Sequence, residues 1–365
     1  MLTAKRIIWI TGDYFFDVDA SVVPYIKEYY NLDIDWYVIK SYNNNIDIPK
    51  DGYTKMFYLH HKGKDPRVIF DYMRIFDAIK LNNADLIYSN YVGVPYYYPY
   101  LHYYIRKKMP IIHAAHNVIP YKVWPLSLVW YTRYVFRFNK HFQLFSEFTN
   151  EYFKKKYPNK SIFYCPMTLK GYGEVSTDNY QIDPEKLNLL FFGNVAGNKR
   201  LDLLIDAIKH LPEQIREKVH LTIAGKCNEA QKYMNQIGGC KSISTFFKRI
   251  DDDEIAELFN KHDYLMLPYQ DVAQSGPHMI AYYYNLPVIA SDIDGFSERV
   301  IDNQNGLLFK NGDEQKLINV ITKASMMKKE DYYTLKTNLK KYAVENFSLE
   351  YVSNEYVKYF RHILK

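Results

Sequence analysis

The sequence predicts an α/β protein built from two doubly wound parallel-sheet domains in tandem, and three observations lead to this prediction. A length of 365 residues fits two domains better than one. Short apolar runs alternate with amphipathic helical stretches, as is typical of parallel sheets. The pattern then restarts at LNLLFFGN (187–194), after a stretch rich in Gly, Ser, Asn and Asp at 167–184.

The apolar runs define the expected strands, and amphipathic helices fill the gaps between them. The segment 65–83, for example, places its apolar residues on one helical face. The carboxyl ends of such strands meet at one edge of a sheet, where ligands bind. The expected strands are 6–12, 34–40, 55–61, 84–90, 110–116, 141–146 and 161–166 in the first half, and 187–194, 219–225, 242–250, 263–269 and 286–291 in the second.

Composition limits the class of protein. Only three cysteines occur, which favours a reducing compartment over a disulfide scaffold. The apolar run near the N-terminus ends at Gly12-Asp13 and is expected to be a buried strand, because a signal peptide needs a longer apolar region. No window approaches the roughly 18 apolar residues of a spanning helix. We therefore expect a soluble, cytoplasmic protein.

Aromatic residues make up 17% of the chain, with 37 tyrosines among them. Because tyrosine is amphipathic, the excess predicts broad half-wet surfaces, although a compositional bias explains it equally well. The segment 120–140 is expected to be a basic, aromatic helix that lies in an anionic membrane interface, and 94–108 offers a second such patch. The alternative is that both helices bury their aromatic side chains. The first segment combines four bases with the aromatic residues Trp124, Trp130, Tyr131, Tyr134, Phe136 and Phe138.

Charge is unevenly distributed along the chain. The net charge of +6 divides into +9 for residues 1–170, which hold 23 Lys and Arg against 14 Asp and Glu, and −3 for the remainder. No acid occurs between Asp85 and Glu147, and this one-sign field predicts an anionic partner. Nucleic acid is not expected, because no recognisable binding module accompanies the charge. The bases in this stretch are Arg106, Lys107, Lys108, Lys122, Arg133, Arg137 and Lys140.

Two segments of the second half have the character of a phosphate-binding site. In 191–208 a glycine ends a buried strand, and Lys199 follows at the start of a helix, where the helix dipole disfavours a cation by roughly 0.3–1 kcal/mol. In 269–280 the sequence Gln274-Ser275-Gly276 opens a helix whose first turn presents unpaired N–H groups. Taken alone, each segment has an ordinary explanation. Lys199 could be a solvated surface lysine, and Ser275 could be a purely structural N-cap.

With these segments, the second half resembles the donor domain of GT-B glycosyltransferases, in particular the retaining group called family 4. The resemblance rests on the strand–glycine–lysine–helix opening and on a closing block matched by NLPVIAS (285–291), Asp294-Gly295, Glu298 and Asn305-Gly306. It is detailed over 187–310 and looser before 110, although PIIHAAHNVIP (110–120) looks like the histidine-bearing loop of an acceptor domain.

The resemblance implies two doubly wound Rossmann-like domains facing across a cleft. They are an acceptor-binding domain at 1–170 and a donor-binding domain at 171–345, with a terminal helix at 346–365 that crosses back to the first domain. Lys199 would neutralise the donor diphosphate and His116 would lie beside the donor sugar, as the catalytic candidates. The donor-binding candidates are Gly193, Asn194, Lys199, Arg249, Ile250, Gln274, Ser275 and Gly276, and the acceptor-binding candidates are Gly12, Asp13 and Asn117.

The sequence also departs from the family pattern. Two glutamates that flank the phosphate helix in the family fall on Val272 and Ile280, and two histidines appear as Tyr121 and Met167. A polysaccharide-assembling branch with the same Gln-Ser-Gly pattern also lacks the paired glutamates, so inactivity does not follow. No acidic cluster is placed for a metal, since residues 251–253 suit a helix N-terminus. We expect no metal and no cofactor.

The expected function is transfer of a sugar from a UDP- or GDP-linked donor to a glycan or a lipid-diphosphate-linked acceptor. The resemblance implies retention of configuration and a role in cell-surface polysaccharide biosynthesis. The basic half adds an expectation of peripheral association with the inner face of an anionic membrane through 94–140. Two alternatives stay open: a nucleotide-sugar epimerase of the same fold, and a non-catalytic, transferase-like binding subunit.

Overall fold

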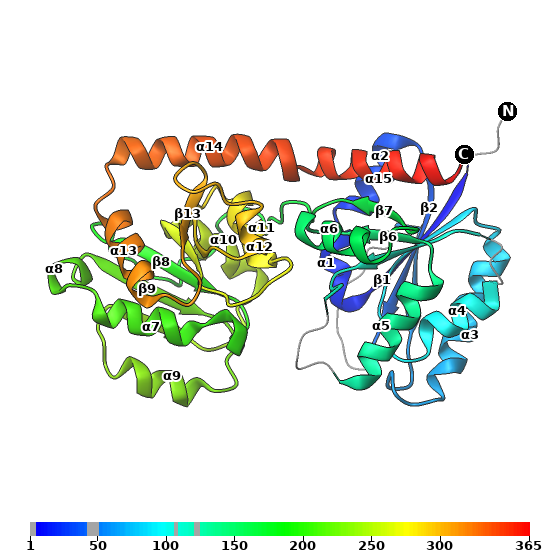
Figure 1. The fold of residues 1–365 in the computed structure, drawn as a ribbon, viewed down its shortest axis with the longest axis horizontal. Helices are drawn as coiled ribbons and strands as arrows, with labels where there is room; N and C mark the ends of the chain where they lie inside the picture. Colours follow the sequence, from blue (N-terminus) through cyan, green and yellow to red (C-terminus); the bar gives the residue numbers. More distant parts are fainter. Residues whose placement is uncertain (1–4, 42–50, 106–108, 120–124) are drawn as a thin grey trace. The chain divides into compact units, whose positions relative to one another are not determined.

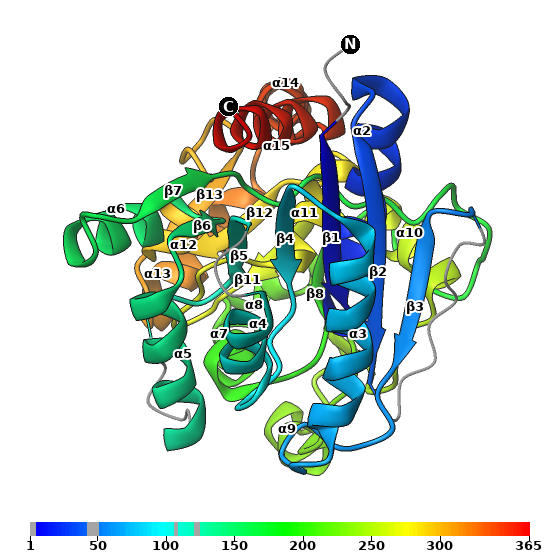
Figure 2. The same ribbon diagram turned by 90° about the vertical axis from the view of Figure 1, so that its right-hand side faces the viewer.

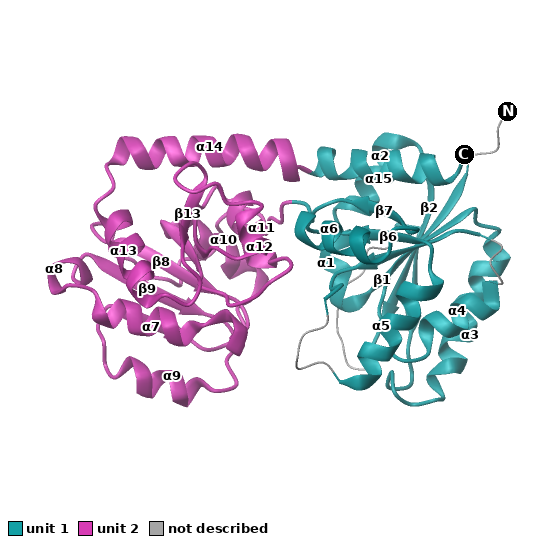
Figure 3. Cartoon of the chain, in the orientation of Figure 1, with its two compact units in different colours: residues 1–168, 349–365 teal, residues 169–348 magenta. Residues whose placement is uncertain are grey.

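The computed structural model describes residues 5–41, 51–105, 109–119 and 125–365. The chain divides into two compact units (Figure 3). The N-terminal unit comprises residues 1–168 and 349–365, and the C-terminal unit comprises residues 169–348. The boundaries expected from the sequence were 170 and 345. Within the described parts of the chain, no helix combines the length and the apolar character needed to span a bilayer.

The N-terminal unit is a parallel sheet with the strand order β3-β2-β1-β4-β5-β6-β7 over its described residues (Figure 2). Each expected run of the first half overlaps one of these strands, which confirms the doubly wound prediction. The strands are β1 (Arg6–Gly12), β2 (Asp33–Lys40), β3 (Thr54–Tyr58), β4 (Leu86–Asn90), β5 (Ile111–Ala115), β6 (His141–Leu144) and β7 (Ser161–Tyr164).

Helices cover both faces of this sheet. On one face α2 and α15 pack over Trp9 and Trp36, and on the other face α3, α4, α5 and α6 enclose a second apolar layer. The C-terminal helix α15 is joined to the sheet by a hydrogen bond of 3.1 Å between the hydroxyls of Tyr356 and Tyr88. The helices of this unit are η1 (Asp13–Phe15), α1 (Phe16–Asp19), α2 (Val22–Tyr30), α3 (Val68–Asn82), α4 (Tyr97–Ile105), α5 (Leu126–Phe138), α6 (Glu147–Lys156) and α15 (Leu349–Ile363).

The C-terminal unit repeats this plan (Figure 1). Its strand order is β10-β9-β8-β11-β12-β13. Each expected strand of the second half contains one of these, and β13, in a short Gly-Leu run, extends the sheet beyond them. The strands are β8 (Leu187–Phe192), β9 (Val219–Ala224), β10 (Ile243–Phe246), β11 (Tyr264–Leu267), β12 (Val288–Ser291) and β13 (Gly306–Phe309).

The helices of the C-terminal unit connect these parallel strands. The expected helix after β8 begins as a short 3-10 turn, η2, before α7. Helix α10 starts at an Asp251 capping box with Glu254, as the acidic run 251–253 predicts. The helices are η2 (Gly197–Lys199), α7 (Leu201–His210), α8 (Glu213–Arg216), α9 (Ala230–Ile237), α10 (Asp252–Lys261), α11 (Gly276–Tyr283), α12 (Asp294–Ser297), α13 (Glu314–Ser325) and α14 (Lys329–Phe347).

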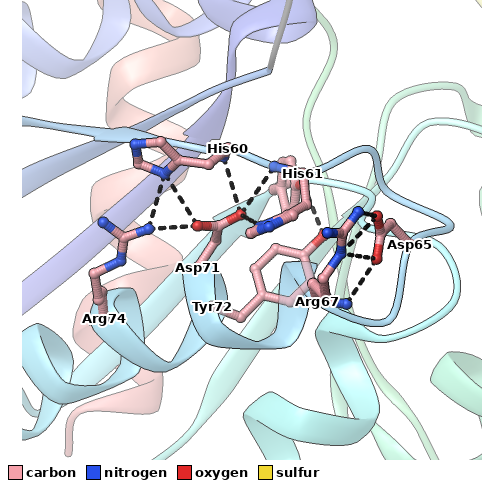
Figure 4. Close-up of polar contacts among 8 residues, drawn as sticks. His60, His61, Asp65, Arg67, Asp71, Tyr72 and Arg74 are labelled. Atoms are coloured by element: carbon pink, nitrogen blue, oxygen red, sulfur yellow. Dashed lines mark hydrogen bonds and ion pairs between the residues drawn. The ribbon is translucent and has the colours of Figure 1, made fainter.

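The loop after β3 corrects one strand boundary. The sequence predicts a strand that continues through His61, but β3 ends at Tyr58. The reason is the buried carboxylate of Asp71 on α3, which accepts the backbone N–H groups of His60 and His61 at 3.0 and 3.2 Å (Figure 4). The Nδ1 atoms of both imidazoles and the guanidinium of Arg74 also contact this carboxylate. Asp71 therefore takes the backbone donors that a longer strand would have used.

The stretch before β8 is irregular, as predicted, yet it is held firmly on α10. The buried carboxylate of Glu257 accepts hydrogen bonds from the hydroxyl of Thr177 at 2.5 Å and from the backbone N–H groups of Asn179 and Tyr180 at 2.9 and 2.7 Å. Lys261 donates to the same carboxylate at 2.8 Å. Four donors thus converge on one side chain, which fixes residues 177–180 against the C-terminal unit.

Candidate active site

The strand order of the C-terminal sheet reverses between β8 and β11, the switch point of a doubly wound sheet. Chain connections leave this point in opposite directions, which opens space at the carboxyl ends of the two strands, and ligands bind there. We call the segment after β8 the β8 loop (residues 193–200) and the segment after β11 the β11 loop (residues 268–275). Six of the predicted donor-binding residues lie in these loops or directly after them: Gly193, Asn194, Lys199, Gln274, Ser275 and Gly276.

The β8 and β11 loops are joined to each other by hydrogen bonds. The backbone N–H of Gln270 donates to the carbonyl oxygen of Asn198 at 2.7 Å, and the amide of Asn198 donates to the carbonyl oxygen of Asp271 at 3.3 Å. Gly193 has a φ of 102°, which favours glycine, and a Cβ there would lie 3.2 Å from the Nζ of Lys199. It would also lie 3.6 Å from Pro277 in the first turn of α11, so the lysine and this helix approach the same glycine.

Lys199 is half-buried, and its ammonium lies 5.4 Å from the centroid of the Tyr269 ring. Burial lowers the pKa of Lys199 to about 8. Residues 169–348 are all described, and none of their carboxylates forms an ion pair with this ammonium. Because burial disfavours the charged form and no acid compensates for it, an anion bound here would gain a direct electrostatic partner.

The start of α11 provides hydrogen-bond donors next to this ammonium. Ser275 is the N-cap residue, and its hydroxyl oxygen accepts the backbone N–H of His278 at 3.4 Å. Gly276 is exposed, so no side chain covers the first turn of the helix. Gln274 is half-buried immediately before the cap. A cation and a helix N-terminus at a switch point form a site suited to a phosphate or diphosphate.

Asn194 belongs to this group by position, and it is exposed in the β8 loop. The other two predicted donor residues lie outside both loops. Arg249 and Ile250 were expected at the end of their strand, but β10 ends at Phe246, where the N–H of Lys248 closes a tight turn on the Phe246 carbonyl at 2.8 Å. Arg249 and Ile250 therefore lie in the loop before α10, and β10 is two strands away from β8.

The positions of the missing glutamates have structural roles in this chain. Ile280 is 4% exposed and packs inside the C-terminal unit. The carbonyl oxygen of Val272 lies 2.1 Å from where a Cβ on Gly295 would stand, so the β11 loop presses directly against the start of α12. Neither position can supply a polar contact to a ribose or sugar hydroxyl, and this much was visible from the sequence.

The N-terminal unit has its own switch point, between β1 and β4. Gly12 ends β1, and a Cβ there would lie 2.9 Å from Tyr91 and 3.0 Å from Tyr14, so only glycine fits between these rings. Asp13 was predicted to bind the acceptor, but its carboxylate accepts the backbone N–H of Ser41 at 2.7 Å and the hydroxyl of Ser41 at 3.0 Å. These two bonds give Asp13 the role of joining the ends of β1 and β2.

His116 follows β5 at the same edge of the N-terminal sheet. Its imidazole is stacked between Phe15 and Phe145, with centroid distances of 3.8 and 4.3 Å and interplanar angles of 13° and 15°. Its Nε2 lies 2.7 Å from the Oδ1 of Asn90. Burial lowers the pKa of His116 to about 3, so this ring is neutral near pH 7. Asn117, the neighbouring acceptor candidate, is exposed.

The partners of His116 are the residues that the sequence did not reveal. Asn90 ends β4, and its amide nitrogen donates to the buried carboxylate of Asp19 at 3.0 Å. The hydroxyl of Thr11 donates to the same carboxylate at 2.6 Å. A polar residue at the end of each predicted strand was a usable signal, but which of them meet depends on the strand order.

Two Rossmann-like units of this kind define the GT-B fold, and the similar solved structures are GT-B glycosyltransferases. Residues 186–325 match the family described as Glycosyl transferases group 1, so the C-terminal unit carries that domain. The matched region includes Lys199, Ser275 and Gly276. The comparison therefore assigns the switch point of the C-terminal unit to a glycosyltransferase domain.

The similarity to solved structures covers nearly the whole chain, and the similarity to curated relatives covers about half of it or less. The Anabaena protein HepE, solved with UDP and glucose, has a TM-score of 0.73 at 14% identity, covering 98% of this chain and 100% of that one. WaaG, a glycosyltransferase involved in lipopolysaccharide biosynthesis, has a TM-score of 0.71 at 16% identity, covering 97% and 99%. An uncharacterized glycosyltransferase of Methanocaldococcus jannaschii is 24% identical over 185 residues, 49% of this chain and 46% of that relative. The chain spans less than half the length of the curated relatives it matches.

Proposed function

We propose that this chain transfers a sugar from a nucleotide-diphosphate donor, UDP-linked in the first instance, to a glycan or a lipid-linked acceptor. The observation that carries the proposal is the ammonium of Lys199 beside the first turn of α11, at the switch point of a glycosyl transferases group 1 domain. The UDP complex of HepE favours UDP over GDP as the donor nucleotide.

In the proposed reaction, Lys199 and the backbone N–H of Gly276 stabilise the negative charge that develops on the departing diphosphate. Preorganised donors of this kind act where charge appears in the transition state. This chain's own residues provide that charge stabilisation, so we propose transfer without a metal or other cofactor. The family 4 resemblance implies retention, with the acceptor hydroxyl attacking from the side of the leaving group and an oxygen of the departing diphosphate taking the hydroxyl proton. WaaG, through its involvement in lipopolysaccharide biosynthesis, favours a role in cell-surface polysaccharide assembly.

The first test is the thermal stability of the protein with UDP, GDP, CMP and their sugar conjugates, each with and without EDTA. A ligand at 100 times its Kd stabilises by about 2.7 kcal/mol, which corresponds to a rise in Tm of roughly 5–10 °C for a unit of this size. We expect this rise with UDP and UDP-sugars, and we expect it to persist in EDTA. A rise with another nucleotide would reassign the donor.

The same experiment separates the alternatives. If no nucleotide shifts the Tm, the donor site is wrong, and the non-catalytic binding subunit becomes the better description. If UDP-sugar binds, incubation without an acceptor distinguishes the two enzyme classes. Conversion of the bound sugar to its epimer would favour an epimerase, whereas transfer that depends on an added acceptor would favour the transferase.

The N-terminal unit also carries a surface suited to an anionic membrane. Along α5, Leu126, Trp130, Arg133 and Arg137 recur at helical spacing on an exposed face, with the two apolar side chains 76% and 65% exposed. The guanidinium of Arg133 lies 5.4 Å from the centroid of the Trp130 ring. Basic and aromatic side chains on one helix face are typical of helices that lie in a membrane interface.

The structure also limits this surface. Tyr131 and Phe136, which the sequence offered to the membrane, are buried in the N-terminal unit, as are Tyr97 and Tyr98 of α4. The competing expectation, that these helices bury their aromatic side chains, therefore holds for those four residues. Several residues of the predicted patches lie outside the described residues: Arg106, Lys107, Lys108, Tyr121, Lys122 and Trp124.

We propose peripheral binding through this face of α5, and the double substitution Arg133→Ala/Arg137→Ala tests it. Each basic residue near an anionic leaflet contributes about 1 kcal/mol, so we expect roughly 30-fold weaker partitioning onto vesicles containing anionic lipid. Co-sedimentation measures the change. The control is Lys154→Ala/Lys155→Ala, which removes two exposed charges from α6 of the same unit. Equal loss in both variants, or equal binding to zwitterionic vesicles, would remove the proposal.

A further inference from the structure

A chain of hydrogen bonds runs beneath His116 through the core of the N-terminal unit. The indole N–H of Trp36 donates to the hydroxyl oxygen of Thr11 at 2.8 Å, and that hydroxyl donates to Asp19 at 2.6 Å. The amide of Asn90 donates to the same oxygen of Asp19 at 3.0 Å, and the amide oxygen faces Nε2 of His116 at 2.7 Å. Thr11, Trp36, Asp19 and Asn90 are all 0% exposed.

The donors and acceptors along this series of hydrogen bonds are fixed by the chemistry of the groups. Thr11 uses its oxygen to accept from Trp36, so its single proton points to Asp19. A carboxylate accepts only, so Asn90 must turn its NH₂ group towards Asp19 and its oxygen towards His116. An amide oxygen accepts only, so Nε2 of the neutral imidazole must carry the proton. Nδ1 is then the acceptor nitrogen of the ring.

The same elements fix the plane of the imidazole. Phe15 and Phe145 stack on its two faces, and Phe15 directly precedes α1, the short helix that ends at Asp19. Burial raises the pKa of Asp19 to about 7, and the hydrogen bonds from Thr11 and Asn90 act against that shift. The two donors thus favour the ionised carboxylate, which is the form that keeps Asn90 in this orientation.

We propose that Asn90 and Asp19 are positioning residues for His116, and that they hold its imidazole as the Nε2–H tautomer with Nδ1 as the acceptor nitrogen. The inference rests on the proposed function, because an acceptor nitrogen at this edge of the sheet suits a sugar hydroxyl. His116 is the residue that would contact the substrate, and Asn90 and Asp19 act through it.

The tautomer can be measured without any substrate. In the full chain labelled with ¹⁵N-histidine, long-range ¹H–¹⁵N correlation distinguishes a protonated ring nitrogen from an unprotonated one. We expect a single tautomer for His116 of the wild type, with the proton on Nε2, and loss of that single state in Asn90→Ala. Asp19→Asn is the second variant, and we expect the same change because a neutral amide no longer fixes the orientation of Asn90.

His113 is the internal control, because its Nδ1 lies 2.6 Å from the hydroxyl of Tyr98 and outside this chain of bonds. Its signals should be unchanged in any variant that remains folded. Turnover provides the second readout: kcat should fall by about tenfold or more, while KM for the nucleotide sugar is retained. A merely structural role would instead move His113 or the KM.

The outcomes separate the two proposals. Protonation of His116 on Nδ1 in the wild type, or an unchanged tautomer in both variants, would overturn the positioning inference. A wild-type protein that shows the Nε2–H tautomer but binds no nucleotide and transfers no sugar would contradict the proposed function and leave the tautomer result standing.

Discussion

Lys199→Ala should abolish most of the transfer activity and much of the nucleotide affinity. A hydrogen bond from a charged group contributes roughly 1.5–3 kcal/mol, so the Kd for UDP should rise about 10- to 150-fold. Loss of a preorganised charge at the leaving group should lower kcat by roughly 10²–10³. Isothermal titration calorimetry with UDP and a steady-state transfer assay measure the two effects.

The pKa of Lys199 adds a pH dependence to this prediction. Its value of about 8 in the free protein means that the ammonium loses its proton as the pH rises through that value. Affinity for UDP should therefore be highest below pH 8 and should fall above it in the wild type. In Lys199→Ala the weaker affinity should be flat over the same range.

Two variants control for effects other than charge at this position. Lys199→Arg keeps a cation and should retain part of the affinity, although the planar guanidinium has a different shape. Lys232→Ala removes an exposed lysine from α9 of the same unit and should leave both Kd and kcat unchanged. If Lys199→Ala bound UDP with the affinity of the wild type, the diphosphate would have to bind away from Lys199.

The prediction of a donor site rests on signals that are local in the sequence. A glycine after a buried run, a lysine that opens a helix and a Ser-Gly N-cap each lie within one short segment. The strand order, which the sequence did not predict, adds that the β8 and β11 loops leave adjacent strands. Arg249 and Ile250 were less well placed, because the apolar run that suggested their strand continues past the residues that pair.

The acceptor side was less predictable because its contacts are distant in the sequence. His116, Asn90 and Asp19 come from three separate elements, and only the strand order β1-β4-β5 brings them together. Asp13 shows a contact of the same kind. A carboxylate after a strand-end glycine suggested a ligand contact, and the structure adds that each of its oxygens accepts one hydrogen bond from Ser41, the residue after β2.

The tyrosine excess was also only partly informative. The sequence suggested half-wet surfaces, yet Tyr72, Tyr88, Tyr97 and Tyr98 are 0% exposed. Their hydroxyls find partners inside the fold, such as Tyr91 at 3.0 Å for Tyr72 and Ser89 at 3.3 Å for Tyr97. A buried tyrosine needs such a partner, and composition alone does not show where one exists.

The last prediction concerns the link between the irregular segment 177–180 and α10. Glu257→Ala removes the acceptor for four hydrogen bonds and leaves the backbone N–H of buried Tyr180 without a partner, at a cost of about 1–3 kcal/mol. We expect the Tm of the C-terminal unit to fall by roughly 6–12 °C for a loss of about 3 kcal/mol. Differential scanning calorimetry measures this shift.

The pH dependence of stability gives the same prediction an independent readout. Burial alone would raise the pKa of Glu257, but hydrogen bonds from Lys261, Thr177 and the backbone lower it to about 2, below its ordinary value of 4.5. A group with a lowered pKa stabilises the fold above its unfolded-state pKa, so this contribution is complete above about pH 4.5 and is lost as the pH falls towards 2. Glu257→Ala should therefore lose less stability on acidification than the wild type.

Glu229→Ala, which removes an exposed carboxylate on the same unit, should stay within about 0.5 kcal/mol of the wild type at every pH. If Glu257→Ala matched that control, residues 177–180 would not be held by this carboxylate.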